Sequence, residues 1–325
     1  MIFMIKEYES KIISGIPLER EEACRLAAEG TVTLPELFTS ADNIRKTFIG
    51  NDIEFCAIVN AKSGACPEDC AYCAQSSKSR TGVEIYPFIG KDAVMRQALE
   101  AQRGGVRRFS IVSSGKKPSK KDLKSIAQTL QEIKKAGLGV CASLGLLKKD
   151  ELSYLRDYGL ERCHNNLEAS EHFFPSICST HSYREKIQTL ESARSVGLSV
   201  CSGGIFGMGE SWMDRIDLAF ALRDLEIDSA PINFLNPIKG TRLDHLPPLM
   251  PEEALKVISI FRFILPKKEI RVCGGRIQTL GDRHALIFKA GADSVMTGNY
   301  LVTAGRTYED DLTLLKTEGL RVRNS

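Results

Sequence analysis

The chain has 325 residues, of which 43% are apolar and 26% are charged, and its formal net charge is +3. These values are typical of a globular protein, and so small a net charge without a long basic run argues against nucleic acid as a partner. The apolar opening, residues 1–5, is interrupted by Lys6 and Glu7, so it predicts neither a signal peptide nor a membrane span. Ten cysteines without an export signal indicate a reducing compartment, by default the cytoplasm, where thiols are free to bind metal.

Residues 1–50 are predicted to form an N-terminal helical cap. Short amphipathic segments surround Leu18, Cys24 and Leu34, and Pro35 suits a first helical turn. Cys24 is expected to be a small buried hydrophobe.

From residue 51 onward, strand-like and helix-like patterns alternate. Helical periodicity is clearest over 122–136 and 181–196, where Gly137 and Gly197 end the helices. This alternation predicts the α/β class and a (β/α)8 TIM-type barrel over residues 51–305, with a doubly wound open sheet as the alternative. Residues 303–325 are expected to supply a connection and a C-terminal helix that cover the barrel mouth. The C-terminal extension itself is expected over residues 306–325. The expected strands are 53–60, 106–112, 138–144, 160–166, 198–205, 229–235, 269–273 and 294–297.

A loop with three closely spaced cysteines follows the first predicted strand. Cys66, Cys70 and Cys73 have the spacing C-x3-C-x2-C. Three such thiolates can hold three irons of a [4Fe–4S] cube and leave one iron open, whereas electron-transfer cubes are ligated by four cysteines. A structural zinc site is the alternative, but zinc motifs usually include a fourth Cys or His at similar local spacing, and none follows Cys73 closely. The spacing favours an iron–sulfur site with an open iron.

The odd-numbered strands of the predicted barrel each carry a cysteine: Cys56, Cys141, Cys201 and Cys273. Because alternate strands supply each interior layer of such a barrel, these thiols can converge below the loop and ligate a second cluster. Cysteine is also among the most commonly buried residues, and a phase shift of one residue turns a side chain outward, so the geometry leaves both interpretations open.

The motif C-x3-C-x-aromatic-C after a first strand resembles the radical S-adenosylmethionine (SAM) superfamily, and the phrase from Gly64 to Cys73 resembles the biotin synthase family in particular. The resemblance implies that Cys66, Cys70 and Cys73 carry a [4Fe–4S] cluster whose open iron binds SAM and splits it with one electron. It further implies a radical SAM sulfurtransferase that converts dethiobiotin to biotin, with sulfur from an auxiliary iron–sulfur cluster inside the barrel.

The family's ligands for that auxiliary cluster match this sequence in part. Cys141, Cys201 and Arg271 match three positions, but the fourth is Ser110. Since Cys56 replaces a family serine and Cys273 shares a strand face with Arg271, we expect a variant cluster, [2Fe–2S] or larger, on the four strand cysteines. Arg271 is then a neighbour or a ligand. Cys163 is only a reserve candidate, because its position relative to Asn166 suggests that its side chain faces the other side of the strand.

The resemblance also assigns polar residues at the strand ends to the two ligands. His164, Asn166 and Asn233 are assigned to the substrate, whose ureido ring suits amides that donate and accept. Lys186 replaces a family arginine and loses its bidentate fork, and His164 replaces a family asparagine. Without the resemblance, a polar strand end or the glycine-rich run 201–210 indicates only a loop or a turn. The residues assigned to SAM are Tyr72, Ser113, Ser114, Asn166, Glu168, Lys186, Ile205 and Asn236.

The resemblance implies an electron donor of the flavodoxin or ferredoxin type and allows a homodimer. Two other functions stay open. One is a radical SAM enzyme of the hydrogenase-maturation or methylornithine type, which donates no sulfur and does not need the four strand cysteines. The other is a non-catalytic iron–sulfur or zinc scaffold. The tryptophan and the other histidines are expected at the surface or in packing: His172, His181, His245, His284 and Trp212.

Overall fold

The structure, a computed structural model, describes residues 2–28 and 30–323, except the side chains of residues 2 and 3. Met1 and the last two residues of the expected C-terminal extension therefore lie outside the described residues. Parallel strands pair in the order β1-β2-β3-β4-β5-β7-β8-β9, and β9 pairs with β1, so the sheet closes on itself. The predicted (β/α)8 barrel is confirmed, and the open sheet is wrong. The strands are β1 (Asp52–Lys62), β2 (Arg108–Ser113), β3 (Gly139–Ser143), β4 (Arg162–His164), β5 (Ser199–Cys201), β6 (Gly204–Phe206), β7 (Ser229–Phe234), β8 (Glu269–Val272), β9 (Ser294–Met296) and β10 (Arg321–Val322).

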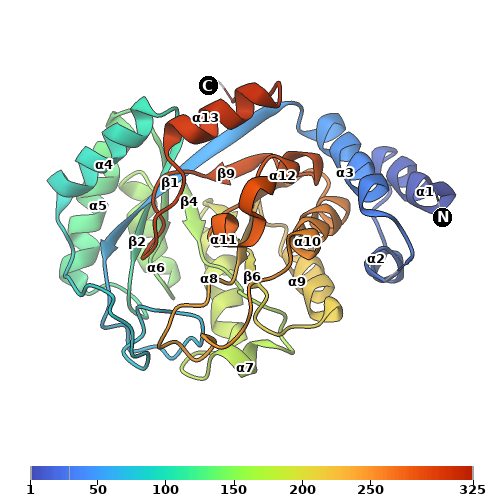
Figure 1. The fold of residues 1–325 in the computed structure, drawn as a ribbon. Coiled ribbons are helices and arrows are strands. Elements are labelled where there is room, and N and C mark those ends of the chain that lie inside the picture. Colours follow the sequence, from blue (N-terminus) through green and yellow to red (C-terminus); the bar gives the residue numbers. More distant parts are fainter. Residues whose placement is uncertain (1, 29, 324–325) are drawn as a thin grey trace.

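Helices surround the barrel and extend it at the N-terminus (Figure 1). The helices are α1 (Ile2–Ile13), α2 (Arg20–Ala27), α3 (Leu34–Phe48), α4 (Lys91–Arg103), α5 (Lys120–Lys135), α6 (Lys149–Asp157), α7 (Phe174–Ile177), α8 (Tyr183–Ser195), α9 (Trp212–Asp224), α10 (Pro251–Ile264), α11 (Arg276–Leu280), the 3-10 helix η1 (Gly281–Arg283), α12 (Leu286–Lys289) and α13 (Tyr308–Thr317).

The fifth predicted strand, 198–205, is interrupted. β5 pairs with β4 and β7, and β6 pairs with β7 alone. The break lies at Gly203, where the chain passes so close to β7 that a Cβ atom would lie 1.8 Å from the carbonyl oxygen of Pro231. Two short strands therefore fill one place in the barrel wall.

The three N-terminal helices lie beside the barrel, where α2 contacts α9 and α3 contacts α10 (Figure 1). The start of α3 follows from its sequence. Thr33 and Glu36 form a capping box, and Pro35 occupies the first turn, where its missing N–H costs nothing. Cys24 is only half-buried, but it packs against the apolar core as expected.

The C-terminal helix does not cover the mouth. β10 pairs with the first residues of β1, and Tyr308 of α13 packs against Gly104 after α4, so this segment lies at the amino-terminal end of the barrel strands. The connection before it, with Tyr300 to Thr303, lines the mouth instead. The expectation was wrong for the helix, because a parallel partner for β1 at residue 321 draws the chain end to the opposite side.

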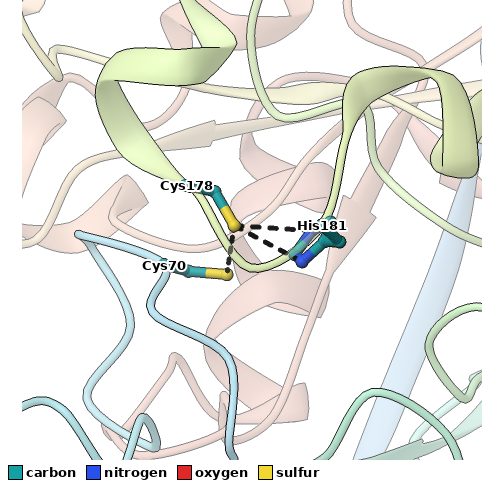
Figure 2. Close-up of side chains that lie close together, drawn as sticks. All are labelled: Cys70, Cys178 and His181. Atoms are coloured by element: carbon teal, nitrogen blue, oxygen red, sulfur yellow. Dashed lines mark hydrogen bonds between the residues drawn. The ribbon is translucent and has the colours of Figure 1, made fainter.

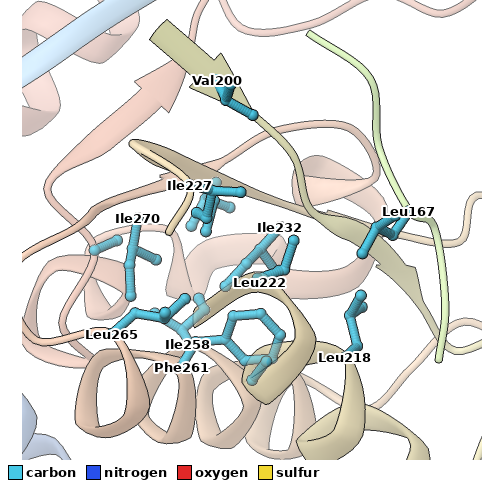
Figure 3. Packing of buried hydrophobic residues seen from close by; sticks show 14 of the residues in the cluster. Leu167, Val200, Leu218, Leu222, Ile227, Ile232, Ile258, Phe261, Leu265 and Ile270 are labelled. Carbon is cyan, nitrogen blue, oxygen red and sulfur yellow. The ribbon is translucent and has the colours of Figure 1, made fainter. Parts of the chain in front are cut away.

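The barrel separates an apolar layer from a polar interior. Outward-facing strand residues such as Val200, Ile232 and Ile270 pack against helix residues such as Leu218 and Phe261 (Figure 3). This burial is the main source of stability. Inward-facing residues are largely thiols, amides and charged groups, and they surround the candidate site. Within the described residues, no helix has the length and apolar character needed to cross a bilayer.

Candidate active site

A cavity of about 290 Å³ opens at the carboxyl ends of the barrel strands. Active sites of (β/α)8 enzymes lie at this end, because the loops after the strands converge there. Thirteen of the residues singled out from the sequence line it: Cys56, Tyr72, Cys73, Ser110, Cys141, His164, Asn166, Glu168, Ile205, Asn233, Asn236, Arg271 and Cys273. The others, Cys66, Cys70, Ser113, Ser114, Lys186 and Cys201, lie around it.

The cysteine loop is fixed to the barrel rim by hydrogen bonds to its backbone. Ser114, directly after β2, donates through Oγ to the carbonyl oxygen of Gly64 at 2.8 Å. The side chain of Gln75 accepts from the N–H of Gly64 at 3.0 Å, and the N–H of Cys66 donates to the carbonyl oxygen of Gln75 at 3.1 Å. These bonds hold Cys66 and Cys73 on one loop above the cavity.

The donor set of this loop fits an iron–sulfur cube. Every cysteine in the described part of the chain is a free thiol, and Cys73 lines the cavity beside Tyr72. Burial raises the pKa of the Cys73 thiol to about 11, and the neighbouring Cys66 thiol contributes to the rise. Thiols that resist ionisation without a cation are readily deprotonated when a metal binds them, so the loop suits a cationic cluster.

Four deeper thiols face the barrel interior. The two-residue alternation of a strand places Cys56 on the inner face of β1 and Cys141 on that of β3, and both line the cavity together with Cys273. Cys201 at the end of β5 is fully buried, and its Sγ lies 3.3 Å from Nδ1 of His164. Four buried thiols around one space are a ligand set that suits iron–sulfur clusters.

The environment divides these thiols. Burial raises the pKa of Cys56 to about 12. Burial also raises the pKa of Cys201, but His164, Arg271 and Arg162 outweigh it and bring the value to about 7. Cys163, by contrast, is on the outward face of β4 and packs in the apolar core. The structure therefore separates the reserve candidate from the other four.

A charged network that the sequence analysis did not identify forms the floor of the barrel. Arg271 donates to Glu269 and, through Nε, to Oγ of Ser294 at 3.0 Å. Arg162 donates to the other oxygen of Glu269 at 3.1 Å, and Glu54 lies 3.6 Å from Arg271. The charged residues come from β1, β4 and β8, so no local sequence pattern indicated the network. Because Arg271 is held by these partners, its orientation below the cavity is fixed.

The exit of β4 presents polar groups to the cavity. Asn166 accepts from the N–H of Gly203 at 3.1 Å and donates to Glu168 at 3.4 Å. Glu168 has a φ of +72°, a conformation that costs free energy for a non-glycine residue and is common at functional sites. Its N–H and carbonyl group bond to Gly203 and Ile205, so the chain conformation and the carboxylate position are set together.

On the opposite wall, Asn233 bridges two strands. Its Oδ1 accepts from the N–H of Gly274 at 3.0 Å, and its Nδ2 donates to the carbonyl oxygen of Gly204 at 3.2 Å. Asn236, two residues after β7, also lines the cavity. The two hydrogen bonds hold the amide of Asn233 in place, and its second N–H and second oxygen lone pair stay available for a ligand.

Lys186 and Ser113 lie outside the cavity lining. Lys186 is buried, and its ammonium donates to the carbonyl oxygen of Asn166 at 2.9 Å and to Oδ1 of Asn165 at 3.4 Å. Ser113 donates to the carbonyl oxygen of Ser114. Lys186 thus supports the β4 exit from behind.

A third group of potential metal ligands includes Cys70. His181, expected at the surface or in packing, is buried, and it lies close to Cys178 and Cys70 (Figure 2). The sequence signal was the spacing Cys178-x2-His181, which is short enough for two ligands of one ion. Of the other histidines, His172 and His245 are exposed and His284 is half-buried; Trp212 packs against Arg215 and Lys256.

Two protein-family models match the chain. The radical SAM superfamily model matches residues 61–222, and the biotin and thiamin synthesis associated domain matches residues 231–321. A biotin synthase of Thermodesulfovibrio yellowstonii is 56% identical over 286 residues, which cover 88% of this chain and 90% of that protein. A biotin synthase of Pelotomaculum thermopropionicum is 44% identical over 313 residues, covering 96% and 98%.

Solved structures with the same fold are more distant in sequence. A methylornithine synthase superposes with a TM-score of 0.85 at 20% identity, covering 98% of this chain and 97% of that one. A maturase of the [FeFe]-hydrogenase gives 0.83 at 16% identity, covering 98% and 75%. At such identities the likeness concerns the fold alone.

Proposed function

The chain belongs to the biotin synthase family of the radical SAM superfamily, and we propose that it inserts sulfur into dethiobiotin to form biotin, with SAM as the source of the radical that activates the substrate. The observation that carries the proposal is the presence of two free-thiol sets at two depths of one barrel. Three cysteines lie on the loop at the mouth, and four line the interior below it.

The upper set would hold the [4Fe–4S] cluster. When bound, that cluster supplies an open iron for SAM and the electron that splits it. The chain's own contribution is a loop whose backbone is bonded to Ser114 and Gln75, so that Cys66, Cys70 and Cys73 stay above the cavity. A fixed loop orients the reacting atoms, and such orientation lowers the activation barrier of the reaction.

SAM would lie across the cavity below this loop. We assign its ribose to Asn166 and Glu168 because these two polar groups point into the cavity from one short segment. Its adenine would lie against Tyr72 and Ile205, with Asn236 nearby. Ser113, Ser114 and Lys186 are assigned to its methionine end. Lys186 would act mainly through Asn166, whose carbonyl group it holds.

The substrate would lie deeper, between SAM and the lower thiols. Asn233 offers an amide to a ureido ring, and His164, which also lines the cavity, lies against Cys201. Apolar side chains, among them Ile58, Val112 and Met296, also line the cavity, and they would limit the access of water to a substrate radical.

The lower set would hold the sulfur donor. We propose that Cys56, Cys141, Cys201 and Cys273 ligate an auxiliary cluster, [2Fe–2S] or larger. Arg271, fixed by Glu269 and Ser294, would be a neighbouring positive charge. Ser110 replaces a family cysteine, but its side chain hydrogen-bonds Cys141, so it still faces the cluster space.

The remaining assignments follow from the family. A flavodoxin- or ferredoxin-type protein would deliver the electrons, and a reducing compartment such as the cytoplasm would keep the thiols free. We also propose a homodimer, and a division into an N-terminal cap (1–50), the barrel (51–305) and a C-terminal extension (306–325).

An anaerobic turnover assay tests the function. Purified protein, reconstituted with iron and sulfide, is given dethiobiotin, SAM and dithionite, and biotin and 5′-deoxyadenosine are quantified alongside bound iron and sulfide. Biotin formation with iron for two clusters is the expected result. SAM cleavage without biotin, with iron for one cluster, would favour the hydrogenase-maturation or methylornithine type. Bound zinc without SAM cleavage would favour a scaffold.

A further inference from the structure

Besides the two thiol sets, the described residues contain a third group of close metal-type ligands, which shares Cys70 with the upper set and adds Cys178 and His181. Figure 2 shows the Cys178 thiol between the other two side chains. The sulfur atoms of Cys70 and Cys178 lie 3.9 Å apart, and Nδ1 of His181 lies 3.3 Å from Cys178 Sγ. Cys178 and His181 lie on the segment between α7 and α8, more than a hundred residues after Cys70, so tertiary packing creates the group.

That packing is well determined, because Asp69 ties the two segments together. Its Oδ1 accepts from the backbone N–H groups of Ser179 at 2.9 Å and Thr180 at 3.2 Å. The N–H of Ala71 in turn donates to the carbonyl oxygen of Ile177 at 2.8 Å. Bonds on both sides of Cys70 therefore hold its thiol against Cys178.

The distances suit a single tetrahedral ion. With metal–sulfur bonds of about 2.3 Å and metal–nitrogen bonds of about 2.0 Å, tetrahedral angles separate two sulfur ligands by roughly 3.8 Å and a sulfur from a nitrogen by roughly 3.5 Å. The three ligand atoms here all lie within 4.8 Å of one another, so small rotations suffice. Glu68 accepts from Nδ1 of His181 at 2.5 Å, which leaves Nε2, 3.7 Å from Cys178 Sγ, as the ligand nitrogen. An oxygen of Asp69, 3.3 Å from Cys178 Sγ, is available as a fourth ligand.

We propose that Cys70, Cys178 and His181 form a mononuclear site for a thiophilic divalent cation, Zn²⁺ or Fe²⁺, in the cluster-free form of this protein. Cys178 and His181 are buried, and thiolate and imidazole ligands match this class of ion. Binding releases thiol protons and involves no oxidant or reductant. The single thiol of Cys70 is a ligand in both sites, and it cannot bind the mononuclear ion and the [4Fe–4S] cluster at the same time. Occupation of one site therefore excludes the other.

Cobalt(II), a visible-absorbing substitute for zinc, tests the site. The full chain carrying Cys66→Ala and Cys73→Ala is prepared without clusters and titrated with Co²⁺ under anaerobic conditions. A matched variant adds Cys178→Ala and His181→Asn. The deep thiols are identical in both proteins, so their contribution cancels. We expect the first protein to bind one more equivalent of Co²⁺ than the second, with a sulfur-to-cobalt charge-transfer band that the second lacks.

Equal binding by the two proteins would overturn the site. Adding Cys163→Ala to the first protein is the control for loss of a buried thiol, and it should leave the extra equivalent unchanged. If the matched variant does not fold, the first protein is loaded with one and with two equivalents of zinc, and X-ray absorption at the zinc edge then identifies the ligand atoms. The difference spectrum between the two samples should show a zinc coordination shell with nitrogen as well as sulfur. A shell of sulfur alone would contradict the role of His181. Neither measurement involves SAM or dethiobiotin, so their outcome is independent of the proposed function.

Discussion

Cys163 and Cys201 lie on neighbouring strands, and their thiols face opposite sides of the barrel wall. β4 pairs with β5 so that His164 lies beside Cys201 and Cys163 beside Val200. Since side chains alternate along a strand, Cys163 joins Val200 in the apolar layer, and Cys201 joins His164 inside. A phase difference of one residue thus distinguishes a core thiol from a potential ligand.

The inward thiols predict a selective loss. Cys273→Ala should remove the auxiliary cluster, and with it biotin formation, while SAM cleavage persists, because the loop cysteines are untouched. Iron and sulfide should fall to the content of one cluster, as measured by chemical analysis and 5′-deoxyadenosine assay. The matched control is Cys163→Ala, which should keep both clusters and lose only about 1 kcal/mol of stability through a small core cavity. Unchanged iron in Cys273→Ala would exclude it as a ligand.

Lys186 supports a second prediction at this scale. Lys186→Met should raise the KM for SAM about tenfold or more, because a charged hydrogen bond contributes roughly 1.5–3 kcal/mol and holds the Asn166 carbonyl group. Lys186→Arg should retain most of the affinity, since it keeps the charge. Initial rates of 5′-deoxyadenosine formation provide KM and kcat separately. An equal loss in both variants, accompanied by a lower melting temperature, would indicate a purely structural role.

The phases of the strand cysteines could be predicted because alternation is a local rule. The approach of Cys178 and His181 to Cys70 could not, because it depends on how Asp69 joins two loops distant in sequence. The motif spacing within each loop was visible, but not the packing between the loops.

The interrupted fifth strand shows how backbone proximity shapes an element. Gly203 and Gly204 carry ordinary φ values, so their requirement is for space and not for a left-handed conformation. A Cβ atom on Gly204 would lie 2.5 Å from Leu218 and 2.7 Å from the carbonyl oxygen of Glu168. The wall at β5 and β6 therefore closes only with two glycines, and this closure places Ile205 and Glu168 at the cavity.

Gly203→Ala should accordingly destabilise the protein by roughly 3 kcal/mol, the upper part of the range for overpacking, because the obstructing atom is backbone and cannot rotate away. Urea unfolding followed by circular dichroism measures the change. Gly82→Ala is the matched control, as Gly82 is exposed, has an ordinary φ and has open space at its Cβ position. A Gly203→Ala protein as stable as this control would contradict the close approach.

The eight strand positions of the barrel and their order were predictable, since the apolar runs alternate with amphipathic helices, but the separate strands β6 and β10 were not predicted. The observed bounds differ from the predicted ones by one or two residues for most strands. The break at Gly203 was not predictable, because the sequence 198–205 has a continuous strand pattern and the obstruction comes from Pro231 on β7.

At the scale of the whole molecule, the barrel is closed by the pairing of β9 with β1, and its two ends differ in character. The mouth carries the thiols and amides of the site, and at the opposite end β10 pairs with the first residues of β1, where Arg323 pairs with Glu54 at 3.3 Å. The floor network of Glu269, Arg162 and Arg271 lies between them, and it connects β4 to β8 across the interior. No sequence pattern predicted this network, because its partners come from distant strands.

Glu269→Gln should destabilise the fold by about 3–5 kcal/mol near neutral pH, because it removes the carboxylate that two buried guanidinium groups share. Burial raises the pKa of Glu269, but Arg271 and Arg162 outweigh it and lower the value from 4.5 to about 2. Between these values the unfolded chain binds more protons than the native protein. The ionised carboxylate therefore stabilises the native state fully above pH 4.5, and its contribution declines as the pH falls towards 2.

The comparison of urea midpoints at pH 7 and at steps from pH 5 down to pH 3 measures this contribution. The difference in unfolding free energy between the unmodified protein and Glu269→Gln should be largest at pH 7 and shrink steadily through the acid range, because the variant lacks the titrating group. Glu84→Gln, at an exposed position, should follow the unmodified protein at every pH. If the difference stays constant as the pH falls, Glu269 is not ionised in the folded barrel. Glu54, 3.6 Å from Arg271, is then the carboxylate that balances the buried arginines.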